Sequence, residues 1–191
     1  MRFMSEPEPI AAATEARDRF NYCPECGGAA PAPERSRAFS CENCGFVLYF
    51  NVAGAYGGLI VDDEGRLLVV RRARDPARGL LAFPGGFADP GETAEAGLLR
   101  EVFEEVGLRV EIIDYLCSHP NPYTYRGITY PVLDLFYLCR IVSPHNVSLT
   151  LQASEIAGYE WRDPGTIQPE EIAFPSLRAA LQCYLKRMPV K

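Results

Sequence analysis

Residues 86–108 read GFADPGETAEAGLLREVFEEVGL, a turn followed by the pattern of an amphipathic helix. Thr93 carries a hydroxyl that suits a helix N-cap, and Gly107 is of the residue type favoured just after a helix ends. The stretch therefore predicts a helix that begins near Thr93 and ends at Gly107.

The predicted helix has two unlike faces. At about 100° per residue, apolar side chains fall on one arc and glutamates on another, roughly opposed to the first. The apolar set is Leu98, Leu99, Val102, Phe103 and Val106, and the acidic set is Glu101, Glu104 and Glu105. One face is expected to join the core, and the other forms a carboxylate cluster.

The carboxylate cluster is unfavourable unless a cation gathers it. Like charges three or four positions apart cost about 0.2–0.5 kcal/mol per pair. Glu104 and Glu105 also lie in the last turn, where the helix dipole disfavours anions. Hard oxygen ligands without clustered histidine favour Mg²⁺ or Mn²⁺ over zinc. An isolated E-x-x-E-E pattern would equally suit a solvated acidic helix face.

The residues before the helix favour the metal interpretation. Gly85 and Gly86 let the backbone turn tightly and bring a carbonyl close to a metal, so the Gly85 carbonyl is a candidate extra ligand. Arg100 is expected to pair with Glu92 and to clamp the loop. A solvated acidic face explains neither these glycines nor the arginine.

The spacing of these residues resembles the Nudix box of the Nudix hydrolase family. Its fixed positions are filled by Gly86, Glu92, Arg100, Glu101, Val102, Glu104, Glu105, Gly107 and Leu108. The resemblance implies an α/β/α sandwich that hydrolyses a nucleoside diphosphate linked to another group. It also implies that Glu101, Glu104 and Glu105 are metal ligands, with Glu105 placed to order or deprotonate the attacking water.

Length and composition are typical of one principal domain with a small appendage. The chain has 191 residues and a net charge of −6, which gives the protein as a whole no electrostatic attraction to nucleic acid or anionic membranes. Its N-terminus lacks a long apolar segment, and no run of eighteen apolar residues occurs. We expect a cytoplasmic protein with a flexible tail at 1–20, a ribbon at 21–50 and a catalytic domain at 51–191.

Four of the seven cysteines form two C-x-x-C pairs. The spacing of Cys23, Cys26, Cys41 and Cys44 predicts a Cys₄ zinc ribbon, with local disulfides or a redox pair as the alternative. Few cations accompany the ribbon, which favours a structural role over nucleic-acid binding. The remaining Cys117, Cys139 and Cys183 are expected in the core.

The rest of the chain predicts a mixed sheet with helices. Strands are expected at Ala53–Val61, 66–72, 110–117, 132–141 and 159–161, with further pairing at 148–151, and a helix at 176–188. Residues 72–86 are expected to form a loop. This pattern predicts an α/β sandwich around a central sheet.

A zinc ribbon before the first strand resembles the NADH pyrophosphatase branch of the Nudix family. That branch carries a Ser-Gln-Pro-Trp-Pro-Phe-Pro motif, and residues 118–124 here read SHPNPYT. Tyr123 and Tyr125, in a predicted loop, are candidates to stack on a base or nicotinamide ring. The missing tryptophan leaves nicotinamide specificity open. Glu155, before Trp161, is a candidate fourth carboxylate by the same resemblance.

Cationic side chains precede the box. Arg71 and Arg72 are candidates to contact substrate phosphates, and an exposed hairpin rim is the alternative. The resulting hypothesis is Mg²⁺- or Mn²⁺-dependent hydrolysis of a dinucleotide such as NADH to AMP and a mononucleotide. Alternatives are an ADP-ribose or other nucleoside diphosphate pyrophosphatase, removal of the NAD cap from RNA, and a nucleotide sensor or nucleic-acid binder without catalysis. We expect a small-molecule nucleotide substrate, no nucleic acid or membrane partner, and a possible homodimer.

Overall fold

The computed structural model describes residues 14–29, 37–142 and 149–188. The chain forms two compact units: residues up to Asn51 together with Tyr123–Tyr130, and Val52–Pro122 together with Pro131–Lys191. We call them the ribbon unit and the sandwich unit, and we describe each by itself.

The ribbon unit contains short elements. These are β1 (Thr14–Glu15), the 3-10 helix η1 (Ala16–Arg19), β2 (Ala38–Ser40) and β3 (Val47–Tyr49). Strands β2 and β3 pair antiparallel, and β1 pairs parallel with residues 128–129. Residues 1–13 of the predicted tail lie outside the described residues. Within residues 14–20, Phe20 packs on Phe39 and Phe50 with ring centroids 5.9 and 5.1 Å apart.

The sandwich unit is built on a mixed sheet. Its elements are β4 (Ala53–Val61), β5 (Leu67–Arg72), β6 (Leu81–Ala82), α1 (Ala94–Val106), β7 (Val110–Tyr125), β8 (Ile128–Ile141), β9 (Ile156–Arg162), the 3-10 helices η2 (Pro164–Thr166) and η3 (Pro169–Glu171), and α2 (Pro175–Arg187). The tip of the β7–β8 hairpin belongs to the ribbon unit. Strand β4 pairs parallel with β8 and antiparallel with β5, and β5 pairs antiparallel with β6 and β9.

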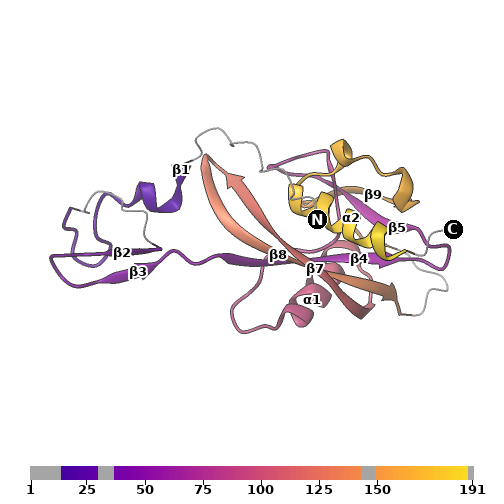
Figure 1. The fold of residues 1–191 in the computed structure, drawn as a ribbon, viewed down its shortest axis with the longest axis horizontal. Helices are drawn as coiled ribbons and strands as arrows, with labels where there is room; N and C mark the ends of the chain where they lie inside the picture. Colours follow the sequence, from indigo (N-terminus) through magenta and orange to yellow (C-terminus); the bar gives the residue numbers. More distant parts are fainter. Residues whose placement is uncertain (1–13, 30–36, 143–148, 189–191) are drawn as a thin grey trace, which may run out of the picture. The chain divides into compact units, whose positions relative to one another are not determined.

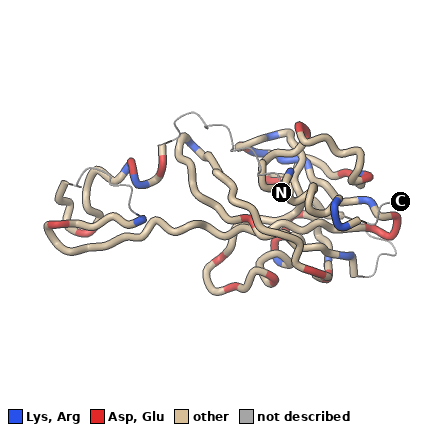
Figure 2. The backbone as a smooth tube through the Cα atoms, viewed as in Figure 1, with Lys and Arg blue, Asp and Glu red and all other residues tan. Residues whose placement is uncertain are grey.

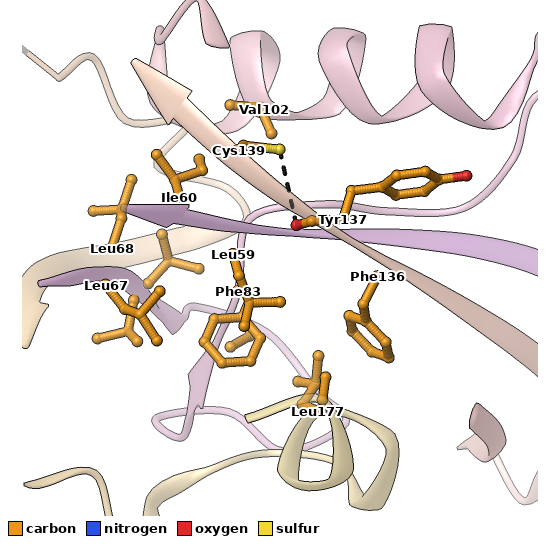
Figure 3. Packing of buried hydrophobic residues seen from close by; sticks show 14 of the residues in the cluster. Leu59, Ile60, Leu67, Leu68, Phe83, Val102, Phe136, Tyr137, Cys139 and Leu177 are labelled. Atoms are coloured by element: carbon orange, nitrogen blue, oxygen red, sulfur yellow. Dashed lines mark hydrogen bonds between the residues drawn. The ribbon is translucent and has the colours of Figure 1, made fainter. Parts of the chain in front are cut away.

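The two long helices cover opposite faces of this sheet (Figures 1 and 3). Val102 of α1 lies on one side together with Ile60 and Cys139, whereas Leu177 of α2 lies on the other side near Phe83 and Phe136 (Figure 3). The predicted α/β/α sandwich with a mixed sheet is therefore confirmed. None of the described helices has the length and apolar character needed to cross a bilayer.

Helix α1 begins and ends as predicted. The Thr93 hydroxyl accepts a hydrogen bond from the Ala96 N–H at 3.2 Å, and Gly107 ends the helix at φ +72°. Its buried face is narrower than predicted: Leu99 and Phe103 are 38% and 50% exposed. At about 100° per residue, only Leu98, Val102 and Val106 fall within one narrow arc, and these three are fully buried.

Residues 118–125 belong to strand β7, so the loop predicted for them from the sequence is wrong. Pro120 and Pro122 are typical of loops, but among the described strands β7 pairs with β8 alone, and an edge strand tolerates proline. The hairpin turns at Arg126 and Gly127, both at positive φ (+48° and +77°), as a two-residue turn requires.

Two other predicted segments also differ in the structure. Residues 72–86 include β6, which pairs with β5, and so do not form a loop throughout. The predicted strand at 148–151 begins with Ser148, which lies outside the described residues. Residues 149–151 form no strand, because Thr150 bonds to the end of α1 and not to the sheet: its N–H donates to the Val106 carbonyl at 3.0 Å.

Candidate functional site

The Pro84–Gly86 turn lies against the backbone of β4. The Gly58 N–H donates to the Pro84 carbonyl at 2.9 Å, and the Tyr56 N–H donates to the Gly86 carbonyl at 2.8 Å. A Cβ at Gly85 would lie 2.1 Å from the Tyr56 carbonyl oxygen, and φ at Gly85 is +148°. Only glycine allows this approach, which explains Gly85 physically.

The same turn contacts the carboxylates of α1. The Gly85 N–H donates to Glu105 Oε2 at 2.9 Å. A Cβ at Gly86 would lie 2.4–2.6 Å from the Glu101 carboxyl group, so this position also needs a residue without a side chain. Glu105 is buried, at 6% exposure, whereas the side chain of Glu104 is half exposed.

Burial of Glu105 departs from the expectation that the acidic face points away from the core. Viewed down the helix axis, Glu105 lies only about 20° from the buried Leu98. The glutamate face therefore begins directly beside the buried apolar face. The carboxylate cluster is therefore recessed at one end and exposed at the other.

The environment of these acids favours their protonated forms. Burial raises the pKa of Glu105 to about 8; the Gly85 N–H acts in the opposite direction, while the charges of Glu101 and Glu155 add to the increase. Burial also raises the pKa of Glu101, despite its contact with Arg100. A recessed acid with few donors and acidic neighbours has the character of a site completed by a cation.

Arg100 gathers the acids of the loop and the helix. Its guanidinium makes two hydrogen bonds to Glu92, at 3.0 and 2.9 Å, so the structure contains the ion pair predicted from the sequence. The same group lies 3.0 Å from Glu101 and 3.2 Å from Glu104. The pKa of Glu92 is lowered, first by Arg100 and then by the Asp89 N–H.

Gly97 is a residue that the sequence analysis missed. A Cβ there would lie 2.3 Å from the Tyr56 ring and 2.5 Å from Glu92 Oε1. Glycine in a helix interior costs about 1 kcal/mol relative to alanine. A glycine between good helix formers therefore could have indicated a close contact at this position. The structure shows that contact, because Glu92 approaches the helix at Gly97.

Residues 150–152, before β9, form hydrogen bonds to the C-terminal end of α1. The N–H groups of Thr150 and Gln152 each donate at 3.0 Å, to the carbonyls of Val106 and Glu105 respectively, which satisfies groups left open at a helix end. Glu155 follows directly, and its charge raises the pKa of both Glu101 and Glu105. Its carboxylate is paired with Arg74 at 2.6 Å.

The two arginines predicted to contact substrate have different surroundings. The Arg71 guanidinium bonds Glu160 at 2.5 Å and the Gly79 carbonyl at 2.8 Å. Arg72 donates to the Pro76 carbonyl at 2.8 Å, and its charge lowers the pKa of Glu105. Of the two, Arg72 is the residue whose charge acts on Glu105, and its guanidinium also lies 5.0 Å from the ring centroid of Phe174.

Tyr123 and Tyr125 belong to the ribbon unit, at the tip of the β7–β8 hairpin. Tyr125 is 42% exposed, and the Arg126 guanidinium lies 5.4 Å from its ring centroid. An exposed aromatic ring beside a cation is able to stack on a planar group.

The four ribbon cysteines come together at one point. Their sulfur atoms all lie within 4.8 Å of one another, with Cys23–Cys44 and Cys26–Cys41 separations of 3.7 Å. Two thiolates on one tetrahedral Zn²⁺ lie about 3.8 Å apart, given Zn–S bonds of about 2.3 Å. The sulfur positions therefore fit a zinc ion, as predicted.

Both cysteine pairs use the same turn. The Gly27 N–H donates to the Cys23 carbonyl and the Gly45 N–H to the Cys41 carbonyl, each at 2.9 Å, and φ at the two glycines is +70° and +77°. The amide of Asn43 donates to the Cys26 sulfur at 3.4 Å and, with backbone bonding to Gly28, lowers the Cys26 pKa to about 6. A thiolate at neutral pH is the form that binds zinc.

The described ribbon residues carry little positive charge. Within 21–29 and 37–50 the one Lys or Arg is Arg37, against Glu25 and Glu42, and Figure 2 marks few Lys or Arg positions along this part of the backbone. The basic footprint of a nucleic-acid-binding ribbon is thus missing from the described residues.

Comparison with known proteins supports the fold and the family. A family model described as NUDIX domain matches residues 53–181. The NAD-capped RNA hydrolase NudC of Chromobacterium violaceum is 27% identical over 184 residues, covering 93% of this chain and 65% of the relative. The NAD-capped RNA hydrolase NudC of Deinococcus radiodurans is 36% identical over 150 residues, covering 77% and 46%. This chain therefore spans about half to two thirds of their length.

A solved structure is similar over most of the chain. The crystal structure of a NUDIX hydrolase from Nitrosomonas europaea superposes with a TM-score of 0.67 at 24% identity, covering 87% of this chain and 90% of that one. At this identity the likeness supports the fold.

Proposed function

The chain belongs to the Nudix family, and from this premise we propose that it is a pyrophosphohydrolase that cleaves the diphosphate of a dinucleotide such as NADH. The products are AMP and a mononucleotide, and the reaction depends on Mg²⁺ or Mn²⁺. The observation that carries the proposal is the recessed Glu105, bonded to the Gly85 N–H and close to the charges of Glu101 and Glu155.

In this proposal the carboxylates of Glu101, Glu104, Glu105 and Glu155 hold the cations. The Gly85 carbonyl adds a ligand, because the Gly85 N–H bonds Glu105 and brings the backbone of this residue next to the carboxylates. Bound divalent cations would neutralise diphosphate charge and lower the pKa of a water molecule.

The protein side chains supply position and proton transfer. Glu105 accepts the proton of the attacking water, since a carboxylate with a raised pKa is a better base near neutral pH. Arg100 fixes Glu92 and the loop by a two-bond contact. Arg72, whose charge acts on Glu105, attracts the substrate phosphates. The role of Arg71 is weaker, because Glu160 already pairs with it.

The second candidate function is removal of an NAD cap from RNA. Both reported relatives are named NAD-capped RNA hydrolases, and the bond broken in a cap is the same diphosphate bond. This candidate revises the expectation that the protein has no nucleic-acid partner. It requires RNA to reach the site without a basic patch on the described ribbon residues.

A substrate panel tests the proposal. Purified protein with Mg²⁺ or Mn²⁺ is incubated with NADH, NAD⁺, ADP-ribose, FAD, diadenosine polyphosphates and NAD-capped RNA, and products are separated by chromatography. We expect AMP and reduced nicotinamide mononucleotide from NADH. Preference for ADP-ribose or for capped RNA would select those alternatives, and binding without cleavage of any compound would favour a nucleotide sensor.

Variants of the hairpin tip test substrate recognition. Tyr125→Ala is expected to raise KM for NADH several-fold while leaving kcat nearly unchanged, as loss of one stacking contact does. Tyr130→Ala is the matched control, because Tyr130 is a similarly exposed tyrosine on the same hairpin (38% against 42%). Equal KM values in both variants would remove Tyr125 from the substrate site.

A further inference from the structure

A second group of metal-ligating side chains lies in the sandwich unit. Cys117 and His119 on β7 and Cys183 on α2 place their ligand atoms within 4.8 Å of one another. Unlike Cys139, which is buried as predicted, Cys117 and Cys183 are only half-buried, so solvent ions have access to the group. No local spacing in the sequence indicates this group, because 64 positions separate His119 and Cys183.

The arrangement follows from regular backbone. Alternate residues of a strand share a face, so Cys117, His119 and Asn121 point to one side of β7. On α2, Ser176 and Cys183 are seven residues, or about two turns, apart and share a helix face. The two faces meet, since His119 contacts Cys183 and Asn121 shares Asp134 with Ser176.

The separations suit tetrahedral coordination. His119 Nε2 lies 3.7 Å from the Cys183 sulfur. A nitrogen and a sulfur bound to one tetrahedral Zn²⁺, at about 2.05 and 2.3 Å, lie about 3.6 Å apart. The ribbon cysteines are separated by the same 3.7 Å.

Hydrogen bonds hold β7 and α2 in place on both sides of the Cys117, His119 and Cys183 group. On one side, Asp134 accepts hydrogen bonds from Ser176 at 2.5 Å and from Asn121 at 2.9 Å, and all three side chains are buried. On the other side, Arg187 donates to the carbonyls of Tyr115 and Leu116, at 3.2 and 2.9 Å. The ligands therefore need little rearrangement to bind an ion.

We propose that Cys117, His119 and Cys183 bind a second Zn²⁺ ion, which fastens β7 to α2. Two sulfurs and one imidazole are ligands that zinc prefers, and Mg²⁺ does not. With three protein ligands, the fourth position is open to water on the half-buried side. This ion is separate from the ribbon zinc and from the carboxylate site.

Metal content tests the proposal in the full chain. Protein purified with reductant and Zn²⁺, then desalted, is expected to contain two zinc ions per chain by elemental analysis. Cys183→Ala and His119→Ala should each contain one, and so should the ribbon variant Cys41→Ser/Cys44→Ser. Cys139→Ala is the matched control, because Cys139 belongs to neither group, and it should keep two.

Cysteine alkylation and Co²⁺ absorption test the same site independently of the zinc count. In wild-type protein, Zn²⁺ should slow alkylation of Cys117 and Cys183, detected by mass spectrometry, which requires no variant to fold. In the ribbon double variant, Co²⁺ should give a thiolate charge-transfer band that His119→Ala weakens. A single zinc in wild type that Cys183→Ala leaves unchanged overturns the proposal. So does alkylation of Cys117 and Cys183 in the reduced protein at the same rate with and without added Zn²⁺.

Discussion

The carboxylate site on α1 and the cysteine ribbon both gather ligands for a metal, but they differ in what holds them in place. The carboxylates project from a helix whose Leu98, Val102 and Val106 are fully buried in the main core. The buried residues of the ribbon are only Cys23, Phe39 and Cys41 among those described, and two of these are ligands themselves. In the first region the fold positions the ligands, and in the second the ligands replace the core.

This difference separates function from stability. A helix packed on a large core tolerates like charges on its other face, so the site can exist before its metal binds. A short segment with little apolar surface cannot offset its conformational entropy without the metal. Removing metal should therefore cost activity in one region and folding in the other.

Loss of the ribbon metal is the largest expected effect. A structural zinc contributes about 10–16 kcal/mol in small zinc domains, so Cys41→Ser should unfold the ribbon locally. Hydrogen exchange followed by mass spectrometry should show loss of protection at 37–50 and retained protection in α1. Cys139→Ala is the control. If the ribbon stays protected from exchange after zinc is chelated and the cysteines are reduced, its aromatic residues are enough to keep it folded without the metal.

Glu105→Gln tests the other side of the comparison. We expect kcat to fall at least ~100-fold, because a neutral amide neither binds the cation as strongly nor accepts the proton. The melting temperature of the metal-free protein should stay the same or rise, since the amide oxygen can still accept from Gly85 and folding no longer requires a buried carboxyl group to take up a proton. Turnover near that of wild type would eliminate Glu105 as the base.

The smallest effect is a pH dependence. The pKa of Glu105 is raised from 4.5 to about 8, so the folded chain keeps a proton that the unfolded chain has released. Without metal, the free energy of unfolding should thus fall as pH rises through this window. Mg²⁺ affinity should rise over the same range by up to about tenfold per pH unit, because binding displaces the proton. Calorimetric titration at several pH values measures the Mg²⁺ affinity. In Glu105→Gln the affinity should depend much less on pH. An unchanged pH dependence would mean that the displaced proton belongs to another group.

Local features were predictable from the sequence. Thr93 and Gly107 set the limits of α1 through short-range hydrogen bonds, and β4 matches the expected Ala53–Val61. The spacing of Cys23, Cys26, Cys41 and Cys44 predicted a cluster because each pair is local and the two pairs have the same spacing.

Features that depend on tertiary structure were not predictable. Pro120 and Pro122 indicated a loop until β7 proved to be an edge strand. Burial of Glu105 depends on where the turn at Gly85 lies, and the pairing of Arg71 with Glu160 joins residues far apart in sequence. Such contacts leave no periodic pattern.

Gly97 has a practical consequence for protein engineering. Replacing a glycine inside a helix with alanine is a common way to stabilise a protein, and propensity alone would favour it here by about 1 kcal/mol. In α1 the new methyl group would instead push against the Tyr56 ring and the Glu92 carboxylate, the partner of Arg100. A design method guided by helix propensity would therefore choose a position at which the gain in the helix is exceeded by the damage to the loop.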